Sequence, residues 1–148
     1  IKVLPEIAKS VAQPLSSIDK VSIIGGDASG ARVLARYRRR LKACGAEVIC
    51  VVNANRPLTD TPEKAVSYVR SIEAAVGLPI TGLVNNTHLC TETELEDILT
   101  GAKLLTEVSK ETGIPIVCHM ASEALAQAAE QSVRPVFPIQ VYMKKPWE

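Results

Sequence analysis

The sequence predicts a three-layer α/β fold, in which a mainly parallel sheet of four to five strands is flanked by helices. Short apolar runs rich in β-branched residues alternate with longer amphipathic stretches, a pattern typical of α/β proteins. The four clearest runs are apolar at nearly every position, as expected for strands buried on both faces of a parallel sheet. The 148 residues suit a single domain, so we expect one α/β unit over residues 1–148.

The predicted strands each end at a residue that favours a turn, namely Gly, Asn or His. A fifth run, at 136–143, contains Pro138. Proline cannot donate a hydrogen bond to a neighbouring strand, so this run is expected to be an edge strand or an extended tail. The four clear strands are expected at residues 21–24, 48–52, 80–84 and 114–118.

Helix signals fill the stretches between these runs. Thr61, Pro62 and Glu63 provide an N-cap, a first-turn proline and an early acid, and Gly77 closes the helix that they open. A longer helix keeps its apolar residues at helical spacing and stops at Gly113. The expected helices cover residues 4–13, 29–43, 62–76, 93–112 and 121–131.

Composition excludes several classes of partner. The net charge of +1 argues against nucleic acid and against an acidic membrane surface. No apolar run reaches the roughly 18 residues that a membrane span requires, and residues 1–9 lack the features of a secretion signal. The cysteines have no zinc or redox spacing, so we interpret them as thiols of a reducing cytoplasm. They are Cys44, Cys50, Cys90 and Cys118.

Two local clusters have a functional and an ordinary interpretation. The arginines of residues 32–40 share one helix and could contact DNA, but acidic helices elsewhere balance them, which favours a solvated helix face. His88 and His119 end predicted strands near Cys90 and Cys118, yet their spacing matches no zinc pattern. We therefore expect no metal site and interpret His88 as a polar turn residue.

Small and amide residues gather where the predicted strands end. Ligands of open parallel sheets bind beyond the carboxyl ends of the strands. Residues of these types suit a pocket for a polar planar ligand, and they also suit ordinary strand-to-helix turns, so both interpretations stay open. The four strand ends are residues 25–30, 53–57, 85–88 and 119–122.

Four stretches carry a family resemblance: GGDASGARVL at 25–34, VNANRPLTDTPE at 52–63, TGLVNNTHL at 81–89 and FPIQVYMKKPWE at 137–148. Together they resemble the C-terminal half of the MinD/ParA-like nucleotide-binding proteins, which are grouped with the CobQ/CobB amidotransferase-type ATPases. The resemblance covers residues 25–148. It implies a glycine turn facing the γ-phosphate and an Asn-Asn pair beside the adenine, where an amide offers a donor and an acceptor side by side. The residues expected to contact a nucleotide are Gly25, Gly26, Asp27, Asn53, Arg56, Asn85 and Asn86.

The chain departs from this family where phosphoryl transfer needs charge. The family's phosphate loop, G-x-x-x-x-G-K-[ST], is missing, and Ile23 stands where the family has a Mg²⁺-binding Asp. We therefore expect a partial or degenerate nucleotide-binding domain with no catalytic residue and no ATP hydrolysis of its own. ATP or ADP would bind weakly. The alternatives are a non-catalytic structural or interaction module and a subunit completed by another chain that supplies the phosphate loop.

Residues 3–24 fit this family poorly. The stretches Leu4–Lys9 and Pro14–Val21 resemble instead the tail of a flotillin-type membrane scaffold. The sequence thus indicates a junction near residue 25, natural or constructed.

Topology predicts self-association. Right-handed crossovers between successive strands, each added on the same side, would place helices 29–43, 62–76 and 93–112 on one face of the sheet. Only residues 4–13 would remain to cover the other face, although the strands are apolar on both sides. We expect a homodimer that buries this face or exchanges the N-terminal helix. The alternative is that the tail at 136–148 folds back over the gap.

Overall fold

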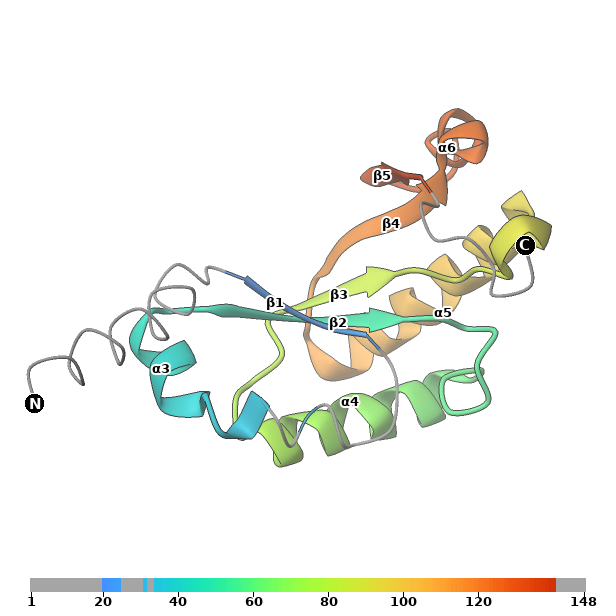
Figure 1. The fold of residues 1–148 in the computed structure, drawn as a ribbon. Helices are drawn as coiled ribbons and strands as arrows, with labels where there is room; N and C mark the ends of the chain where they lie inside the picture. The colour runs from blue at the N-terminus through green and yellow to red at the C-terminus, as the bar shows by residue number, and fades with distance from the viewer. Residues whose placement is uncertain (1–19, 25–30, 32–33, 141–148) are drawn as a thin grey trace, which may run out of the picture.

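A computed structural model describes residues 20–24, 31 and 34–140, with only the backbone of 20–24 described, and shows one five-stranded sheet (Figure 1). Every neighbouring pair of strands is parallel, and the spatial order β1-β2-β3-β4-β5 is the order along the chain. The predicted fold class, an α/β fold with a parallel sheet flanked by helices, is confirmed. The strands are β1 (Lys20–Ile24), β2 (Glu47–Val52), β3 (Gly82–Asn85), β4 (Ile116–Ser122) and β5 (Val136–Ile139).

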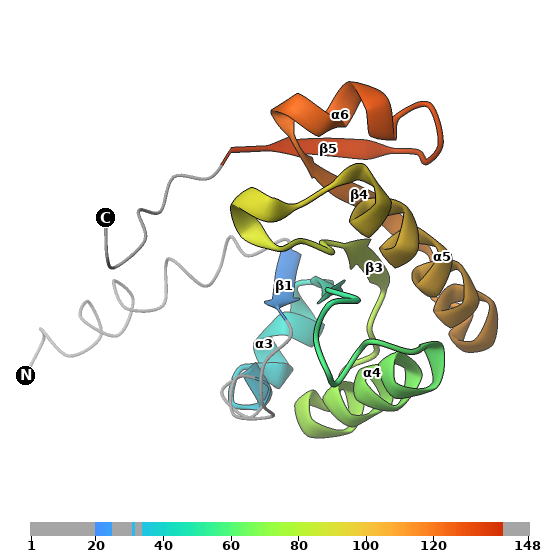
Figure 2. The ribbon, with the colours of Figure 1, turned by 90° about the vertical axis from the view of Figure 1, so that its right-hand side faces the viewer.

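The helices connect successive strands, and α3, α4 and α5 lie on one face of the sheet (Figure 2). This arrangement follows from repeated crossovers of one hand with each strand added at the same edge. It confirms the predicted placement of these helices. Their bounds are α3 (Arg38–Ala43), α4 (Pro62–Val76), the short 3₁₀ helix η1 (Cys90–Glu92), α5 (Leu95–Thr112) and α6 (Glu123–Ala129).

The main core lies between the sheet and these helices. Alternate residues of a strand point to one face, so Val48, Cys50 and Val52 of β2 pack together against Val69 of α4 and Leu105 of α5. Burial, and secondarily the charge of Glu73, raises the pKa of the Cys50 thiol to about 12. This thiol is therefore a packing group rather than a reactive one.

The opposite face of the sheet, called the outer face below, is also apolar. Side chains of β2 to β5 form it, and none of the described helices contributes to its cluster. Three members are buried, two are half-buried, and Val117 and Phe137 are 40% and 56% exposed. The outer face consists of Ile49, Val51, Val84, Val117, Cys118, Met120 and Phe137.

Several local predictions are confirmed. The Thr61 hydroxyl caps α4 by accepting a hydrogen bond from the Lys64 amide at 3.4 Å. Gly77 and Gly113 end α4 and α5 in left-handed conformations, with φ of 70° and 74°. Pro138 lies in β5, which is an edge strand of the sheet. None of the described helices is long and apolar enough to cross a bilayer.

Other boundaries were predicted wrongly. The helix expected at 29–43 is interrupted by a turn at Arg36–Tyr37, and α3 begins at Arg38. Strand β4 runs from Ile116 to Ser122 instead of ending at Cys118, so His119 is a mid-strand residue. Strand β3 starts at Gly82 rather than Ile80, α5 starts at Leu95, and α6 covers only Glu123–Ala129. The helix predicted at 4–13 lies outside the described residues.

Candidate ligand site at the carboxyl edge of the sheet

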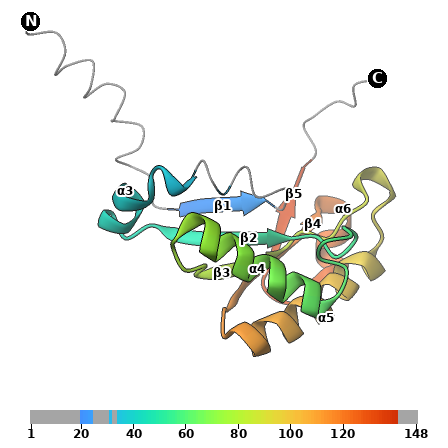
Figure 3. The ribbon, with the colours of Figure 1, turned by 90° about the horizontal axis from the view of Figure 1, so that it is seen from below.

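Asn53, the first residue after β2, joins two loops at the carboxyl edge of the sheet. Its side-chain Nδ2 donates to the His88 carbonyl at 3.2 Å, which ties the loop after β2 to the loop after β3. Its own carbonyl accepts from the Arg56 amide at 3.2 Å and from the Thr59 hydroxyl at 2.7 Å. Both loops are thereby held beside the point where β2 and β3 end, at one end of the sheet (Figure 3).

Asn85 lies in the interior behind this edge. Its side chain has no exposed surface. The Oδ1 atom accepts from the Thr87 amide at 3.1 Å and from the Thr87 hydroxyl at 2.7 Å. The Nδ2 atom donates to the Ile98 carbonyl at 2.9 Å and lies 3.2 Å from Nδ1 of His119. The Asn85 amide is therefore committed to the protein, and we assign it no ligand contact.

The hydrogen bonds of Asn85 fix the state of His119. Because the two Thr87 donors orient Oδ1, the amide presents its N–H to His119 Nδ1. That nitrogen must be the acceptor, so the proton of the neutral ring is on Nε2. Burial lowers the pKa of His119, which favours the same neutral form. We call Asn85, Thr87 and His119 the buried network.

Gly101 of α5 leaves room for the buried network. A Cβ at this position would lie 2.7 Å from Thr87 Cβ and still closer to the Thr87 hydroxyl and to Asn85 Oδ1. The helix backbone can therefore approach these polar side chains only because residue 101 has no side chain. The Thr87 hydroxyl also accepts from the Ala54 amide at 3.0 Å, which extends the network to the loop after β2.

Other polar side chains at this edge are accessible. Arg56 is exposed and Asn86 is half-buried. The Asn86 backbone amide donates to Val52 at 2.8 Å, whereas Asn55 uses its side chain to donate to Asp97 Oδ1 at 3.0 Å. We call the five polar residues at this edge the rim; they are Asn53, Asn55, Arg56, Asn86 and His88.

His88 is held by the turn that follows it. Its Nδ1 accepts from the Cys90 amide at 3.2 Å, and Cys90 adopts a left-handed conformation with φ of 58°. The neutral imidazole therefore carries its proton on Nε2. Partial burial, followed by the positive charge of Arg56, lowers the pKa of His88. Two potential cations thus share this part of the rim.

The structure brings together some of the residues predicted to contact a nucleotide and separates others. Asn53, Arg56 and Asn86 belong to the rim, while Asn85 points into the interior. Gly25, Gly26 and Asp27 lie outside the described residues. Sequence reasoning did not assign His88 to the site, although its position two residues after Asn86 at a strand end was a usable signal.

The histidines and cysteines do not converge. His119 is enclosed in the buried network, and Cys118 points to the outer face. Within the described part of the chain, no group of three or more His, Cys, Asp or Glu side chains is placed to hold a metal ion.

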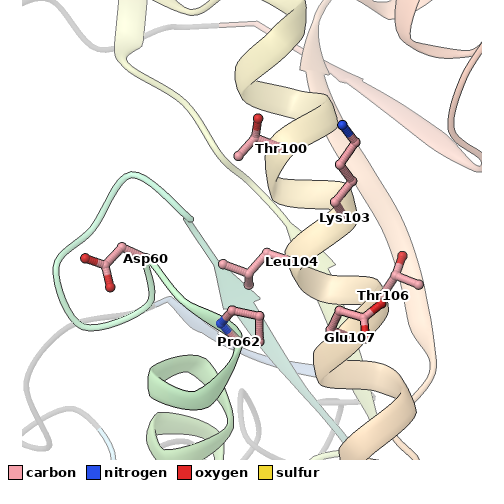
Figure 4. Close-up of a pocket in the computed structure, with 7 residues that line it drawn as sticks. All are labelled: Asp60, Pro62, Thr100, Lys103, Leu104, Thr106 and Glu107. Atoms are coloured by element: carbon pink, nitrogen blue, oxygen red, sulfur yellow. The ribbon is translucent and has the colours of Figure 1, made fainter.

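A separate groove of about 410 Å³ lies between the start of α4 and the middle of α5 (Figure 4). Leu104 and Pro62 provide apolar surface, and Asp60, Lys103 and Glu107 provide charges of both signs. Asp60 is already paired with Lys64 at 2.7 Å, and Glu107 with Lys110 at 2.8 Å. The groove contains none of the rim residues.

No protein-family model, curated protein sequence or solved structure gives a significant match to this chain. The MinD/ParA-like and flotillin-like resemblances therefore rest on the sequence stretches alone.

Proposed function

We propose that this chain is a partial or degenerate MinD/ParA-like nucleotide-binding domain that does not hydrolyse ATP by itself. The observation that carries the proposal is the double anchoring of the loops after β2 and β3 by Asn53, which ties the loop that carries Arg56 to the loop that carries Asn86 at the carboxyl edge. This edge is where open parallel sheets bind their ligands. The absent phosphate-loop Lys and the Ile23 in place of an Asp argue against turnover.

Only part of the expected nucleotide contact set is available. Asn86 and Arg56 offer an amide and a guanidinium, but Asn85 is consumed by the buried network. Without a phosphate loop, we expect ATP or ADP to bind in the millimolar range, equivalent to about −4 kcal/mol.

One observation favours a non-catalytic structural or interaction module instead. Each polar group of the Asn85 amide has a partner inside the protein, which is the pattern of a residue retained for folding. In this alternative the rim is an ordinary set of strand-to-helix turns. A measurement of nucleotide binding distinguishes the non-catalytic module from the nucleotide-binding domain.

A third alternative is completion by another chain that supplies the phosphate loop. In the resembling family, the phosphate-loop strand lies between the counterparts of β1 and β2. Here β1 pairs directly with β2 from Lys20–Glu47 to Ile24–Val51. A complementing strand would have to separate this pair, which makes completion the least favoured arrangement.

An amide-NMR titration with ADP tests the nucleotide proposal. We expect shifts at Asn53, Arg56 and Asn86, and a loss of most of this response in Asn86→Ala. Shifts confined to the opposite edge, near Gly45 and Gly77, would contradict the proposed position. ATP turnover by purified protein that disappears in Asn86→Ala would contradict the absence of hydrolysis.

We also propose that the chain forms a homodimer in the cytoplasm. All four cysteines lie in the described part of the chain and form no disulfide, which suits a reducing compartment. The apolar outer face supports a two-fold contact through β4 and β5, where Val117 and Phe137 are exposed. Exchange of residues 4–13, which lie outside the described part, is the second way to cover this face.

Light scattering at ~100 µM, well above ordinary dimer dissociation constants, tests the dimer. Phe137→Glu should give a monomer, because it places a charge in the apolar contact. Leu58→Glu is the matched control, since Leu58 is 60% exposed in a loop at the carboxyl edge and should leave the dimer intact. A monomeric parent protein at this concentration would sink the proposal.

A further inference from the structure

We propose that Arg56 and the Nε2–H of His88 form a subsite for a phosphate-type oxyanion at the rim. This inference rests on the proposed nucleotide function, because the subsite would take the place of the missing phosphate loop. It concerns a free phosphate or the phosphate group of a nucleotide, which share the same chemistry.

The backbones of Arg56 and His88 are both hydrogen-bonded to one residue, Asn53. The Asn53 carbonyl accepts a hydrogen bond from the Arg56 backbone amide at 3.2 Å. The Asn53 side-chain amide donates a hydrogen bond to the His88 backbone carbonyl, also at 3.2 Å. The Thr59 hydroxyl, at 2.7 Å from the same Asn53 carbonyl, fixes the far end of the Arg56 turn. Two short loops with a shared anchor therefore carry Arg56 and His88 at the same corner of the sheet.

The charge of Arg56 is not neutralised within the described part of the chain. The ion pairs there are Lys64–Asp60, Arg70–Glu73 and Lys110–Glu107, and none of them includes Arg56. A guanidinium offers planar paired donors that match an oxyanion. The group is thus available for a ligand.

His88 contributes a directed donor. The Cys90 amide occupies Nδ1, so Nε2 carries the proton that an oxyanion would accept. Burial, and secondarily the charge of Arg56, opposes protonation of His88 and lowers its pKa. An anion bound between Arg56 and His88 would offset the effect of the Arg56 charge on the pKa of His88.

The neighbouring carboxylates have other partners or positions. Asp97, at the start of α5, accepts from Asn55 at 3.0 Å and from the Glu94 amide at 2.9 Å. Asp60, before α4, pairs with Lys64. Glu92 and Glu94 are exposed at η1 and the start of α5. The positive charge that lowers the His88 pKa is that of Arg56.

The test is an NMR titration of the histidine ring signals with inorganic phosphate, with sodium chloride of equal ionic strength as the reference. We expect phosphate, and not chloride, to raise the pKa of His88. Arg56→Gln should raise the pKa of His88 in the free protein, and it should weaken phosphate binding about tenfold, the effect of losing one charge-assisted contact. Arg70→Gln, which removes the arginine paired with Glu73, is the matched control and should change neither quantity.

Three outcomes would overturn the subsite. They are an unchanged His88 pKa in phosphate, an equal response to chloride, and full phosphate binding by Arg56→Gln. A parallel titration with adenosine separates this inference from the proposed function. A response at Asn86 to adenosine without any phosphate effect would retain the nucleotide site and remove the subsite. Phosphate binding without any response to adenosine or ADP at Asn86 would retain the subsite and remove the nucleotide site.

Discussion

The buried network and the rim contain the same kinds of residue, but the side chains of the network are enclosed in the interior and those of the rim lie at the accessible edge. Asn85 and Asn86 are adjacent in the sequence, yet one has no exposed surface and four hydrogen-bonding contacts, while the other is half-buried at the edge. His119 and His88 form a similar pair, one inside the sheet and one in a turn. Residue type alone therefore does not identify a ligand contact; the direction of each side chain relative to the sheet decides.

The largest expected effect comes from breaking the buried network. Asn85→Ala would leave the Thr87 hydroxyl, the Ile98 carbonyl and His119 without their partner, and unsatisfied buried groups are costly. We expect a loss of about 3 kcal/mol in the free energy of unfolding, measured with urea at neutral pH. Asn86→Ala is the neighbouring control and should stay within about 0.5 kcal/mol of the parent. Equal losses in both variants would erase the distinction between network and rim.

Gly101→Ala should rank second. Alanine normally stabilises a helix interior by about 1 kcal/mol relative to glycine, but here the added methyl group would collide with Thr87 and Asn85. Overpacking of this kind costs about 1–3 kcal/mol, so we expect a net destabilisation of about 1 kcal/mol. In the Asn85→Ala background the same change should cost less, because one colliding group is gone. If Gly101→Ala were more stable than the parent protein, Thr87 and Asn85 would have to move aside for the methyl group without a measurable cost.

Low pH should destabilise the folded protein, because it protonates His119 of the buried network. Its folded-state pKa lies below the ordinary value of 6.5, so between those two values the unfolded chain binds the additional proton. The stability that depends on neutral His119 is therefore complete above pH 6.5 and is lost as the pH falls through the folded-state pKa. His88 contributes in the same direction. Urea unfolding of the parent and of His119→Gln across this range measures the difference, and identical pH profiles would contradict a role for His119.

The smallest effect is expected at the rim. Asn55→Ala removes an exposed hydrogen bond of 3.0 Å to Asp97. Exposed contacts of this type contribute little, so the free energy of unfolding should change by less than about 0.5 kcal/mol. A loss above about 2 kcal/mol would mean that the rim is as structural as the network behind it.

The sequence predicted the fold better than the site because its strand and turn signals are local. Thr61, Gly77 and Gly113 begin or end helices as expected. The handedness of the crossovers, with each strand added on the same side, places the connecting helices on one face of the sheet. The role of Asn85 could not be derived in this way. Both faces of β3 are apolar, so alternation alone does not reveal that the face carrying Leu83 and Asn85 is the one covered by α5.

The position of His119 was missed for a related reason. The apolar run of β4 ends at Cys118, which predicted a loop from residue 119 onward. The strand continues because residues 119–122 pair with β5, and the His119 imidazole finds its hydrogen-bonding partner in the interior at Asn85, on the neighbouring strand β3. That partner is 34 residues away in the chain, so no local pattern could supply it.

The strands lie in the sheet in the same order as in the sequence. This order has a consequence for how the protein folds during synthesis. Each strand pairs with the strand that precedes it in the sequence, from β1–β2 to β4–β5. A strand leaving the ribosome therefore meets an edge that has already been made, and no later segment has to be inserted between finished neighbours. Domains that fold from the N-terminus as they emerge benefit from such an order, because each new unit can dock without reopening the last.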